Sequence, residues 1–133
     1  RTFSEQVQNL VEERMKKIAG NICEANDCEF SWHYQKRYPA TVNSDKETRI
    51  ALSAAQDVCG MEFVDPSTDM VTGSEDFGFM LQEKPGCYAF IGNGPGEGGC
   101  MLHSPTFDFN DEVTPIGASY WVNIVKKVLN SSP

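Results

Sequence analysis

The sequence has few basic residues, no long apolar run and no C-x-x-C motif, and each of these absences excludes a class of protein. Its 11 Lys and Arg stand against 19 Asp and Glu, which gives a formal net charge of −8. No positive charge is left over to neutralise a phosphate backbone, so we expect no nucleic-acid partner. The apolar runs are only a few residues long, whereas a transmembrane helix needs roughly 20, so we expect no membrane partner.

Cysteine and histidine are too scattered for a structural zinc site. The chain has 5 cysteines and 2 histidines, and most of the cysteines are far from either histidine. An odd number of cysteines cannot pair completely within one chain, which argues against a secreted disulfide framework. We therefore interpret the thiols as reduced, as in a cytoplasmic protein. A bridge between Cys23 and Cys28 stays open, because both lie near an expected helix-to-strand turn.

Length and composition fit one folded domain or a piece of a larger protein. The chain has 133 residues, of which 40% are hydrophobic and 23% are charged, a mixture that supports a folded core. It begins Arg1-Thr2-Phe3, and no targeting segment can be read from it. The sequence thus leaves open that an upstream part is missing.

Apolar periodicity predicts alternating helices and strands, which is the pattern of an α/β protein. Ser4 is a good N-cap for a helix whose apolar residues recur every three or four positions as far as Ile22. Residues 29–35 alternate between aromatic and polar side chains, which is typical of a half-buried strand. A composition shift near Tyr38 to Asn43 indicates a boundary between two incomplete domains. The remaining expected elements are strands at 61–64 and 87–91 and helices after Asn43, after Gly73 and from Thr114.

A glycine-rich loop at 94–99 matches the spacing G-x-G-x-x-G after an expected strand. In a dinucleotide site this motif must open a helix whose N-terminal amides face the pyrophosphate. The residues that follow, 100–105, do not resemble a helix start. We therefore expect no nucleotide cofactor at this loop.

Two other segments carry residues suited to chemistry. His103 lies after the glycine-rich loop and before Ser104-Pro105, although a lone histidine is more often a structural residue than a metal ligand. The second segment is G-S-E-D-F at Gly73 to Phe77. Its simplest interpretation is a helix N-terminus whose two acids suit the helix dipole.

The motifs together resemble one family. They are R-T-F-S-E at 1–5, Y-P-A-T-V-N at 38–43, G-S-E-D-F at 73–77, G-N-G-P-G-E at 92–97, L-H-S-P-T-F-D-F-N-D-E at 102–112 and P-I-G-A at 115–118. In this order they resemble the C-terminal part of the metal-dependent amidohydrolases related to hippurate hydrolase, N-acyl-amino-acid hydrolases and plant auxin-conjugate hydrolases. The resemblance covers essentially the whole chain.

This resemblance implies a two-domain fold in the zinc-peptidase and aminoacylase superfamily. Its members have a catalytic α/β domain that is interrupted by a smaller ferredoxin-like lid, and the lid also mediates dimerisation. Residues 1–39 would be the last strand–helix–strand part of the lid, and residues 40–133 would be the C-terminal part of the catalytic domain. A homodimer through the lid is the implied assembly.

The resemblance also assigns roles to individual residues. His103 would bind one of two divalent metal ions, for which imidazole suits Zn, Mn, Co or Ni. Arg1 would meet a substrate carboxylate, and Gly73 and Ser74 would offer backbone amides or a hydroxyl to the substrate. Glu75, Asp76 and Asp108 are expected next to these metal- and substrate-binding residues, as their supporting neighbours. Asp108 either accepts a hydrogen bond from the second nitrogen of the histidine or simply caps the approach to the last helix.

The implied function is hydrolysis of the amide bond of a small-molecule N-acyl amino acid by metal-activated water. The other metal ligands and the general-base glutamate belong to the family's N-terminal half, and no counterpart is found in this sequence. We therefore expect this chain alone to be inactive and to hold no tightly bound metal. Two alternatives stay open: a non-catalytic dimerisation or interaction module that pairs through residues 29–35, and a carboxypeptidase or aminoacylase of a sister branch.

Overall fold

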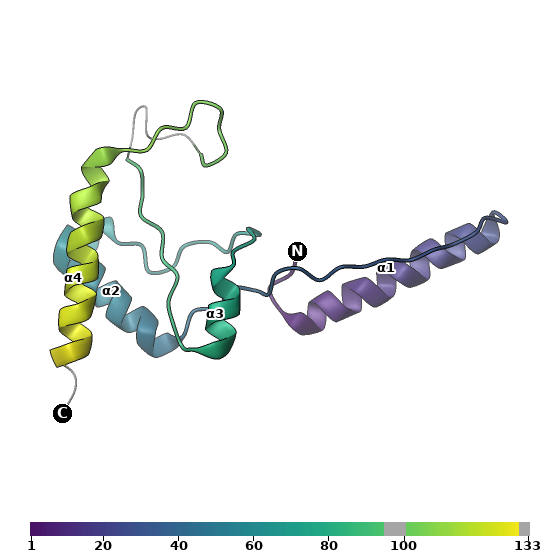
Figure 1. Cartoon of the computed structure of the whole chain (residues 1–133), viewed down its shortest axis with the longest axis horizontal. Coiled ribbons are helices and arrows are strands. Elements are labelled where there is room, and N and C mark those ends of the chain that lie inside the picture. Colours follow the sequence, from purple (N-terminus) through teal and green to yellow (C-terminus); the bar gives the residue numbers. More distant parts are fainter. Residues whose placement is uncertain (95–100, 131–133) are drawn as a thin grey trace. The chain divides into compact units, whose positions relative to one another are not determined.

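A computed structural model describes residues 1–94 and 101–130 of the chain. It divides into two compact units, Arg1–Val42 with Asp69–Pro85 and Asn43–Thr68 with Gly86–Pro133. Each unit is described by itself below. Figure 1 shows the chain coloured along the sequence.

The first unit contains the long helix α1 (Glu5–Ala25), which confirms the predicted N-terminal helix. It begins as expected, because the Ser4 hydroxyl accepts a hydrogen bond from the Val7 N–H at 3.3 Å. Gly20 does not end the helix. A Cβ built there would lie 3.5 Å from a ring carbon of Phe30, so this glycine is covered by an aromatic side chain within the unit.

Residues 29–36 run in extended form beside α1 but form no strand (Figure 1). Alternate rings share one face as the pattern predicted, with ring centroids 6.0 Å apart for Phe30 and Trp32 and 5.9 Å apart for Trp32 and Tyr34. The segment is held to the helix by side chains: Lys36 Nζ lies 3.0 Å from Glu12 Oε2. The predicted strand is not observed, because a strand needs the backbone of a neighbouring strand and no such neighbour is found for this segment among the described residues.

Helix α3 (Phe77–Glu83) completes the first unit and confirms the short helix expected after Gly73. The segment before Asn43 packs on it, with the rings of Tyr38 and Phe79 5.9 Å apart. Gly78 is buried there, and a Cβ at this position would lie 3.1 Å from Pro39 Cγ. A side chain at position 78 would therefore fit only if Pro39 moved by a few tenths of an ångström.

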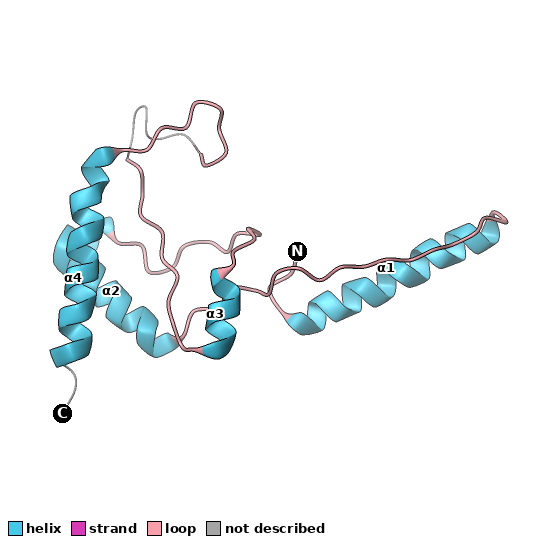
Figure 2. Cartoon of the chain, viewed as in Figure 1, coloured by secondary structure: helices cyan, strands magenta, loops and turns pink. Residues whose placement is uncertain are grey.

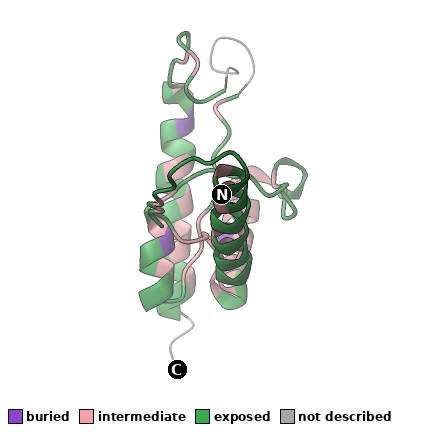
Figure 3. Cartoon of the chain, turned by 90° about the vertical axis from the view of Figure 1, so that its right-hand side faces the viewer, coloured by how far each residue is buried: buried purple, intermediate pink, exposed green. Residues whose placement is uncertain are grey.

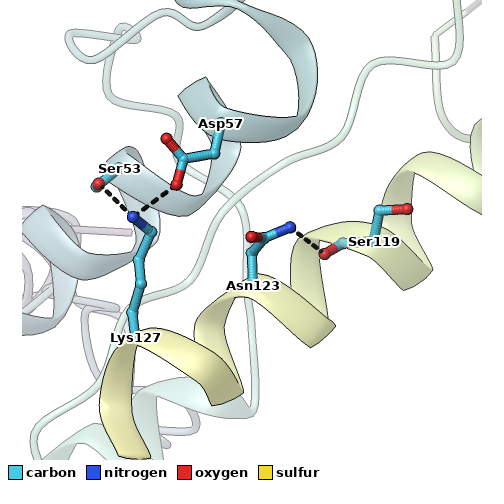
Figure 4. A network of polar contacts seen from close by, with 5 residues as sticks. All are labelled: Ser53, Asp57, Ser119, Asn123 and Lys127. Carbon is cyan, nitrogen blue, oxygen red and sulfur yellow. Dashed lines mark hydrogen bonds and ion pairs between the residues drawn. The ribbon is translucent and has the colours of Figure 1, made fainter. Parts of the chain in front are cut away.

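The second unit is built on a pair of helices, α2 (Asp45–Cys59) and α4 (Thr114–Asn130), both predicted by the sequence. Ala51 and Ala54 of α2 are buried, and Ala54 is 0% exposed. Lys127 of α4 reaches α2, with its Nζ 2.6 Å from Asp57 Oδ2 and 2.8 Å from Ser53 Oγ (Figure 4). Small residues and one ion pair thus hold the two helices together.

Both strands expected in the second unit are absent from the part of it that the structure describes (Figure 2). Residues Met61–Phe63 form a 3₁₀ helix, η1, directly after Gly60, whose φ of 90° turns the chain at the end of α2. Residues 87–91 are extended, but side chains take the place of a neighbouring strand. The Asn43 side chain accepts from the Tyr88 N–H at 2.8 Å and donates to the Tyr88 carbonyl at 2.9 Å.

The α/β fold class is therefore not observed: the described residues are helical and contain no strand (Figure 2). The strand–helix–strand part of a lid is likewise not confirmed. Periodicity identifies which side chains share a face, but a sheet forms only where two extended segments exchange backbone hydrogen bonds. None of the three predicted strands finds such a neighbour among residues 1–94 and 101–130.

Little of the described chain is buried (Figure 3). The 3₁₀ helix η3 (Asp111–Val113) leads into α4 and supplies Val113, which joins Ala51 and Ala54 as a buried hydrophobic residue. Large apolar side chains on the helices stay open to solvent, among them Ile22 of α1 at 59% and Trp121 of α4 at 64% exposed. Uncovered apolar faces of this kind are typical of interaction surfaces. None of the described helices has the length and apolar character needed to cross a membrane.

Candidate functional site

The G-S-E-D-F motif forms the turn that leads into α3. Asp76 is the N-cap residue of α3 but makes no side-chain cap hydrogen bond, whereas Glu75 Oε1 accepts from the Phe77 N–H at 3.2 Å. Gly73 and Ser74 are exposed, and a Cβ built on Gly73 would meet nothing within 4 Å. The backbone of the turn is therefore open to a ligand at the two positions that the sequence assigned to substrate.

Arg1 lies against this turn. Its Nη1 donates to the carbonyl oxygen of Thr72 at 2.6 Å, so the guanidinium group is held next to Gly73 although the two residues are far apart in sequence. A guanidinium group carries five N–H donors, and this bond uses one of them. The structure thus brings together Arg1 and the exposed turn at Gly73 and Ser74, which were predicted as one substrate-binding set.

Glu75 and Asp76 interact with each other. A hydrogen bond from Asp76 to the Glu75 side chain and the negative charge of Glu75 together raise the pKa of Asp76 above its usual 3.8. Two adjacent carboxylates share a proton more readily than they hold two charges. Asp76 therefore keeps its proton to a higher pH than an isolated aspartate does.

A hollow of about 420 Å³ within the first unit has Asp76 in its lining. Arg37 and Tyr38 line it together with Asp76 and Phe79. Sequence reasoning did not select Arg37 or Tyr38 as site residues. Tyr38 opens the Y-P-A-T-V-N motif and Arg37 directly precedes it, but nothing in the sequence showed that this segment packs against α3.

His103 belongs to the second unit and lies on a tight turn. The Ser104 N–H donates to the Met101 carbonyl at 3.1 Å, and His103 has a φ of 69°. A non-glycine residue rarely adopts this left-handed conformation, which costs about 1 to 3 kcal/mol and is enriched at functional sites. The turn exposes His103, so its imidazole is available to a partner.

The residues after His103 form a second turn held by the Ser104 side chain. Ser104 Oγ accepts from the Thr106 N–H at 3.2 Å, and the Phe107 N–H donates to the Ser104 carbonyl at 3.1 Å. Further along, Asn93 joins this segment to the glycine-rich region, because its Nδ2 donates to the Asp108 carbonyl at 2.7 Å. Asp108 is thus fixed through its backbone, and no hydrogen bond joins its carboxylate to His103 among the described residues. Residues 95–99 of the glycine-rich loop lie outside the described residues.

The residues that the structure describes do not by themselves make up a metal site. Among residues 1–94 and 101–130 no group of three or more His, Cys, Asp or Glu side chains is placed to hold a metal ion. A catalytic zinc needs three protein ligands, and a two-metal centre needs more. His103 fits the chemistry of one ligand, and no set of three ligands that includes it forms in the described part of the chain.

Comparison with known proteins identifies relatives along almost the whole chain. The model of Peptidase family M20/M25/M40 matches residues 4–127. The hippurate hydrolase of Campylobacter jejuni is 31% identical over 129 residues, which cover 97% of this chain and 33% of that protein. Thermostable carboxypeptidase 1 of Saccharolobus solfataricus is 30% identical over 122 residues, covering 89% and 30%.

A plant protein is similar over a comparable range. The IAA-amino acid hydrolase ILR1-like 5 of Arabidopsis thaliana is 30% identical over 139 residues, which cover 100% of this chain and 31% of that protein. The chain thus spans about a third of the length of the curated relatives it matches. No solved structure matches the chain at a significant level. These matches confirm the resemblance that the motifs carried.

Proposed function

The chain belongs to the peptidase family M20/M25/M40, a family of metal-dependent peptidases and amidohydrolases, and on this premise we propose that the whole protein hydrolyses the amide bond of N-acyl amino acids. The observation that carries the proposal is the contact between Arg1 and the turn at Gly73. It joins a fixed positive charge to an exposed backbone, which suits a small substrate with a carboxylate next to an amide.

In this proposal Arg1 binds the carboxylate of the amino acid. Charge-assisted hydrogen bonds from a guanidinium group to a carboxylate are short and directional, so they fix the orientation of the substrate. The Thr72 carbonyl limits the movement of the Arg1 side chain before substrate binds. Exposed backbone groups of Gly73 and the hydroxyl of Ser74 then lie next to the bound carboxylate, where they position the substrate amide.

His103 supplies one ligand of the metal centre. When bound, the two divalent ions that the family implies would polarise the amide carbonyl and lower the pKa of a water molecule. The other ligands would come from parts of the protein outside this sequence. The left-handed turn holds the His103 side chain in the open for that purpose, at an energetic cost that a structural histidine would not require.

An activity assay tests the proposal. We expect a protein of the relatives' length to release amino acid from N-acetyl and N-benzoyl amino acids with Mn²⁺ or Zn²⁺, and the 133-residue chain to release none. The variant His103→Ala of the longer protein is expected to lose one metal ion per chain, measured by elemental analysis, as well as activity. His33→Ala is the matched control and should keep both. Turnover by the short chain, or full metal content in His103→Ala, would contradict the proposal.

The same assay distinguishes between the alternative substrates. Release of a C-terminal residue from unblocked peptides, without turnover of N-acyl amino acids, identifies the carboxypeptidase branch. Thermostable carboxypeptidase 1 is one of the relatives named above, so both substrate types belong in the test.

A non-catalytic interaction module is the second candidate, and one observation favours it. The apolar stripe of α1 is open to solvent in the first unit, with Leu10 and Ile18 at 50% and 59% exposed. A stripe of this kind suits pairing with a second copy, as a dimerisation role requires. Sedimentation at graded concentrations tests this role: a monomer at all concentrations excludes it for the chain.

A further inference from the structure

The C-terminal end of α1 is closed by two backbone hydrogen bonds of the Schellman type. The Cys28 N–H donates to the Cys23 carbonyl at 2.9 Å, and the Asp27 N–H donates to the Glu24 carbonyl at 3.3 Å. Asp27 has the left-handed φ of 53° that this motif requires. The turn lies at the end of α1 where the chain reverses (Figure 1).

This turn places the two cysteines opposite each other. In a Schellman motif the side chains at the positions of Cys23 and Cys28 commonly touch, because the chain folds back over the last helical turn. With N and O of the two residues 2.9 Å apart, standard bond lengths keep the two Cα atoms within about 7 Å. This upper limit permits a disulfide, which cannot form when the two Cα atoms are more than about 7 Å apart. Both thiols are reduced in the structure, Cys28 is exposed and Cys23 is half-buried.

We propose that Cys23 and Cys28 form a redox-active dithiol that closes to an intrachain disulfide when the protein meets a small disulfide oxidant such as oxidised glutathione. The exposed Cys28 thiolate attacks one sulfur of the oxidant and releases one molecule of reduced glutathione. The Cys23 thiolate then attacks the Cys28 sulfur in the mixed disulfide and releases the second. The two protein thiols give up two electrons and two protons, and the oxidant takes up both.

The turn is the reason why this pair closes in preference to others. Cys59 and Cys87 belong to the second unit, where no such hydrogen-bonded turn brings them together. For Cys23 and Cys28 the backbone has already been folded into the required shape, so closing the ring orders little further chain. The disulfide would in turn fix the end of α1 and the start of the segment at 29–36.

Thiol mapping at equilibrium tests the proposal. The chain is incubated with graded ratios of reduced to oxidised glutathione, quenched in acid, alkylated, digested and analysed by mass spectrometry. We expect Cys23 and Cys28 in one cross-linked peptide about 2 Da lighter than its reduced form, free of glutathione. Alkylation of both residues under oxidising conditions, or a separate glutathione on each, would overturn the proposal.

Two substitutions of Asp27 separate the role of the turn from that of mere proximity. Asp27→Val keeps both cysteines but disfavours the left-handed conformation, so the equilibrium constant for ring closure should fall roughly tenfold. Asp27→Gly adopts that conformation without strain and should close at least as well as the parent chain. Circular dichroism checks that α1 persists in both. Equal closure in the two variants would show that the turn is irrelevant and would overturn the proposal.

A single-cysteine variant provides the remaining control. Cys28→Ser leaves Cys23 without its partner, so Cys23 should accumulate as a mixed disulfide with glutathione instead of closing a ring. Cys59→Ser should leave closure of the Cys23–Cys28 pair unchanged. Loss of closure in Cys59→Ser would mean that another cysteine is the true partner.

Discussion

Lys127 of α4 lies between two side chains of α2, with its Nζ 2.6 Å from Asp57 Oδ2 and 2.8 Å from Ser53 Oγ. The pair is partly open to water, since the side chains are 28% and 53% exposed, so solvent screens much of the attraction. It nevertheless joins the two helices on which the second unit is built.

We expect the Lys127–Asp57 pair to contribute modestly to stability. A double-mutant cycle with Lys127→Ala and Asp57→Ala should give a coupling energy of about 0.2 to 1 kcal/mol, measured by urea unfolding. The coupling should shrink at high salt. Lys126→Ala is the matched control, because Lys126 is exposed and its neighbour Lys127 makes the contact. A coupling of zero at low salt contradicts this assignment.

Gly20→Ala should stabilise the chain. Glycine in a helix interior costs about 0.5 to 1 kcal/mol relative to alanine, and a Cβ at position 20 would meet Phe30 at an ordinary contact distance of 3.5 Å. Gly78→Ala gives the contrast, since its Cβ would lie 3.2 Å from the Pro39 carbonyl oxygen and should cancel the gain. Thermal unfolding followed by circular dichroism compares the two. The explanation fails if Gly20→Ala lowers the melting temperature.

Asn43→Ala should destabilise the second unit by about 1 kcal/mol, because it removes the donor and the acceptor that serve the backbone of Tyr88. Asn123→Ala is a suitable control: it removes one bond, to the Ser119 carbonyl at 2.9 Å in the preceding turn of α4 (Figure 4). Denaturant midpoints for both variants provide the measurement. Equal losses of stability in the two variants would mean that the contact of Asn43 with Tyr88 contributes no more than a single hydrogen bond within a helix.

Glu75→Gln should lower the pKa of Asp76 towards its ordinary value, because it weakens the hydrogen bond between the two side chains and removes the neighbouring negative charge. The raised pKa means that the folded chain holds this proton more tightly than the unfolded chain. The stability it contributes is present at low pH and is lost as the pH rises from 3.8 through the raised pKa. Titration of the Asp76 carboxyl carbon by NMR, in the parent chain and in Glu75→Gln, measures the shift. An unchanged pKa in the variant would assign the effect to another group.

Arg1→Ala in a protein of the relatives' length should raise KM for N-acyl amino acids at least about tenfold with a smaller change in kcat, because hydrogen bonds to charged groups are worth about 1.5 to 3 kcal/mol. A substrate whose carboxylate is replaced by an amide should bind parent and variant alike. Arg49→Ala, an exposed arginine on α2, should leave KM unchanged. If Arg1→Ala affects both substrates equally, the guanidinium group does not recognise the carboxylate.

The helices were predictable because their information is local. The Ser4 cap and the spacing up to Ile22 predicted α1, and the Thr114-Pro115 start predicted α4. The strands were not predictable in this way. Residues 29–35 carry a strand-like alternation, yet their neighbours in the structure are the side chains of α1. The alternation correctly predicted which side chains share a face, but the described residues contain no second extended segment that pairs with this one.

The candidate site was likewise predictable from the sequence only in part. The motifs identified Gly73, Ser74 and His103 as residues of interest and predicted the family, since motif order is a property of sequence alone. Sequence did not reveal that Arg1 lies on the Thr72 carbonyl, nor that Arg37 and Tyr38 line a hollow beside Asp76. These contacts depend on how α3 packs against distant segments, which no local pattern encodes.

The amino-acid order by itself determined where the helices begin, which side chains share a face, and which family of hydrolases the chain belongs to. The tertiary structure alone decided which of these faces meet, placing Arg1 against the Thr72 carbonyl and the Asn43 side chain against the backbone of Tyr88. The physical reason is the range of the interactions. Caps, periodicity and turn residues act between neighbours in the chain, whereas packing and long-range hydrogen bonds are settled only when remote segments come together.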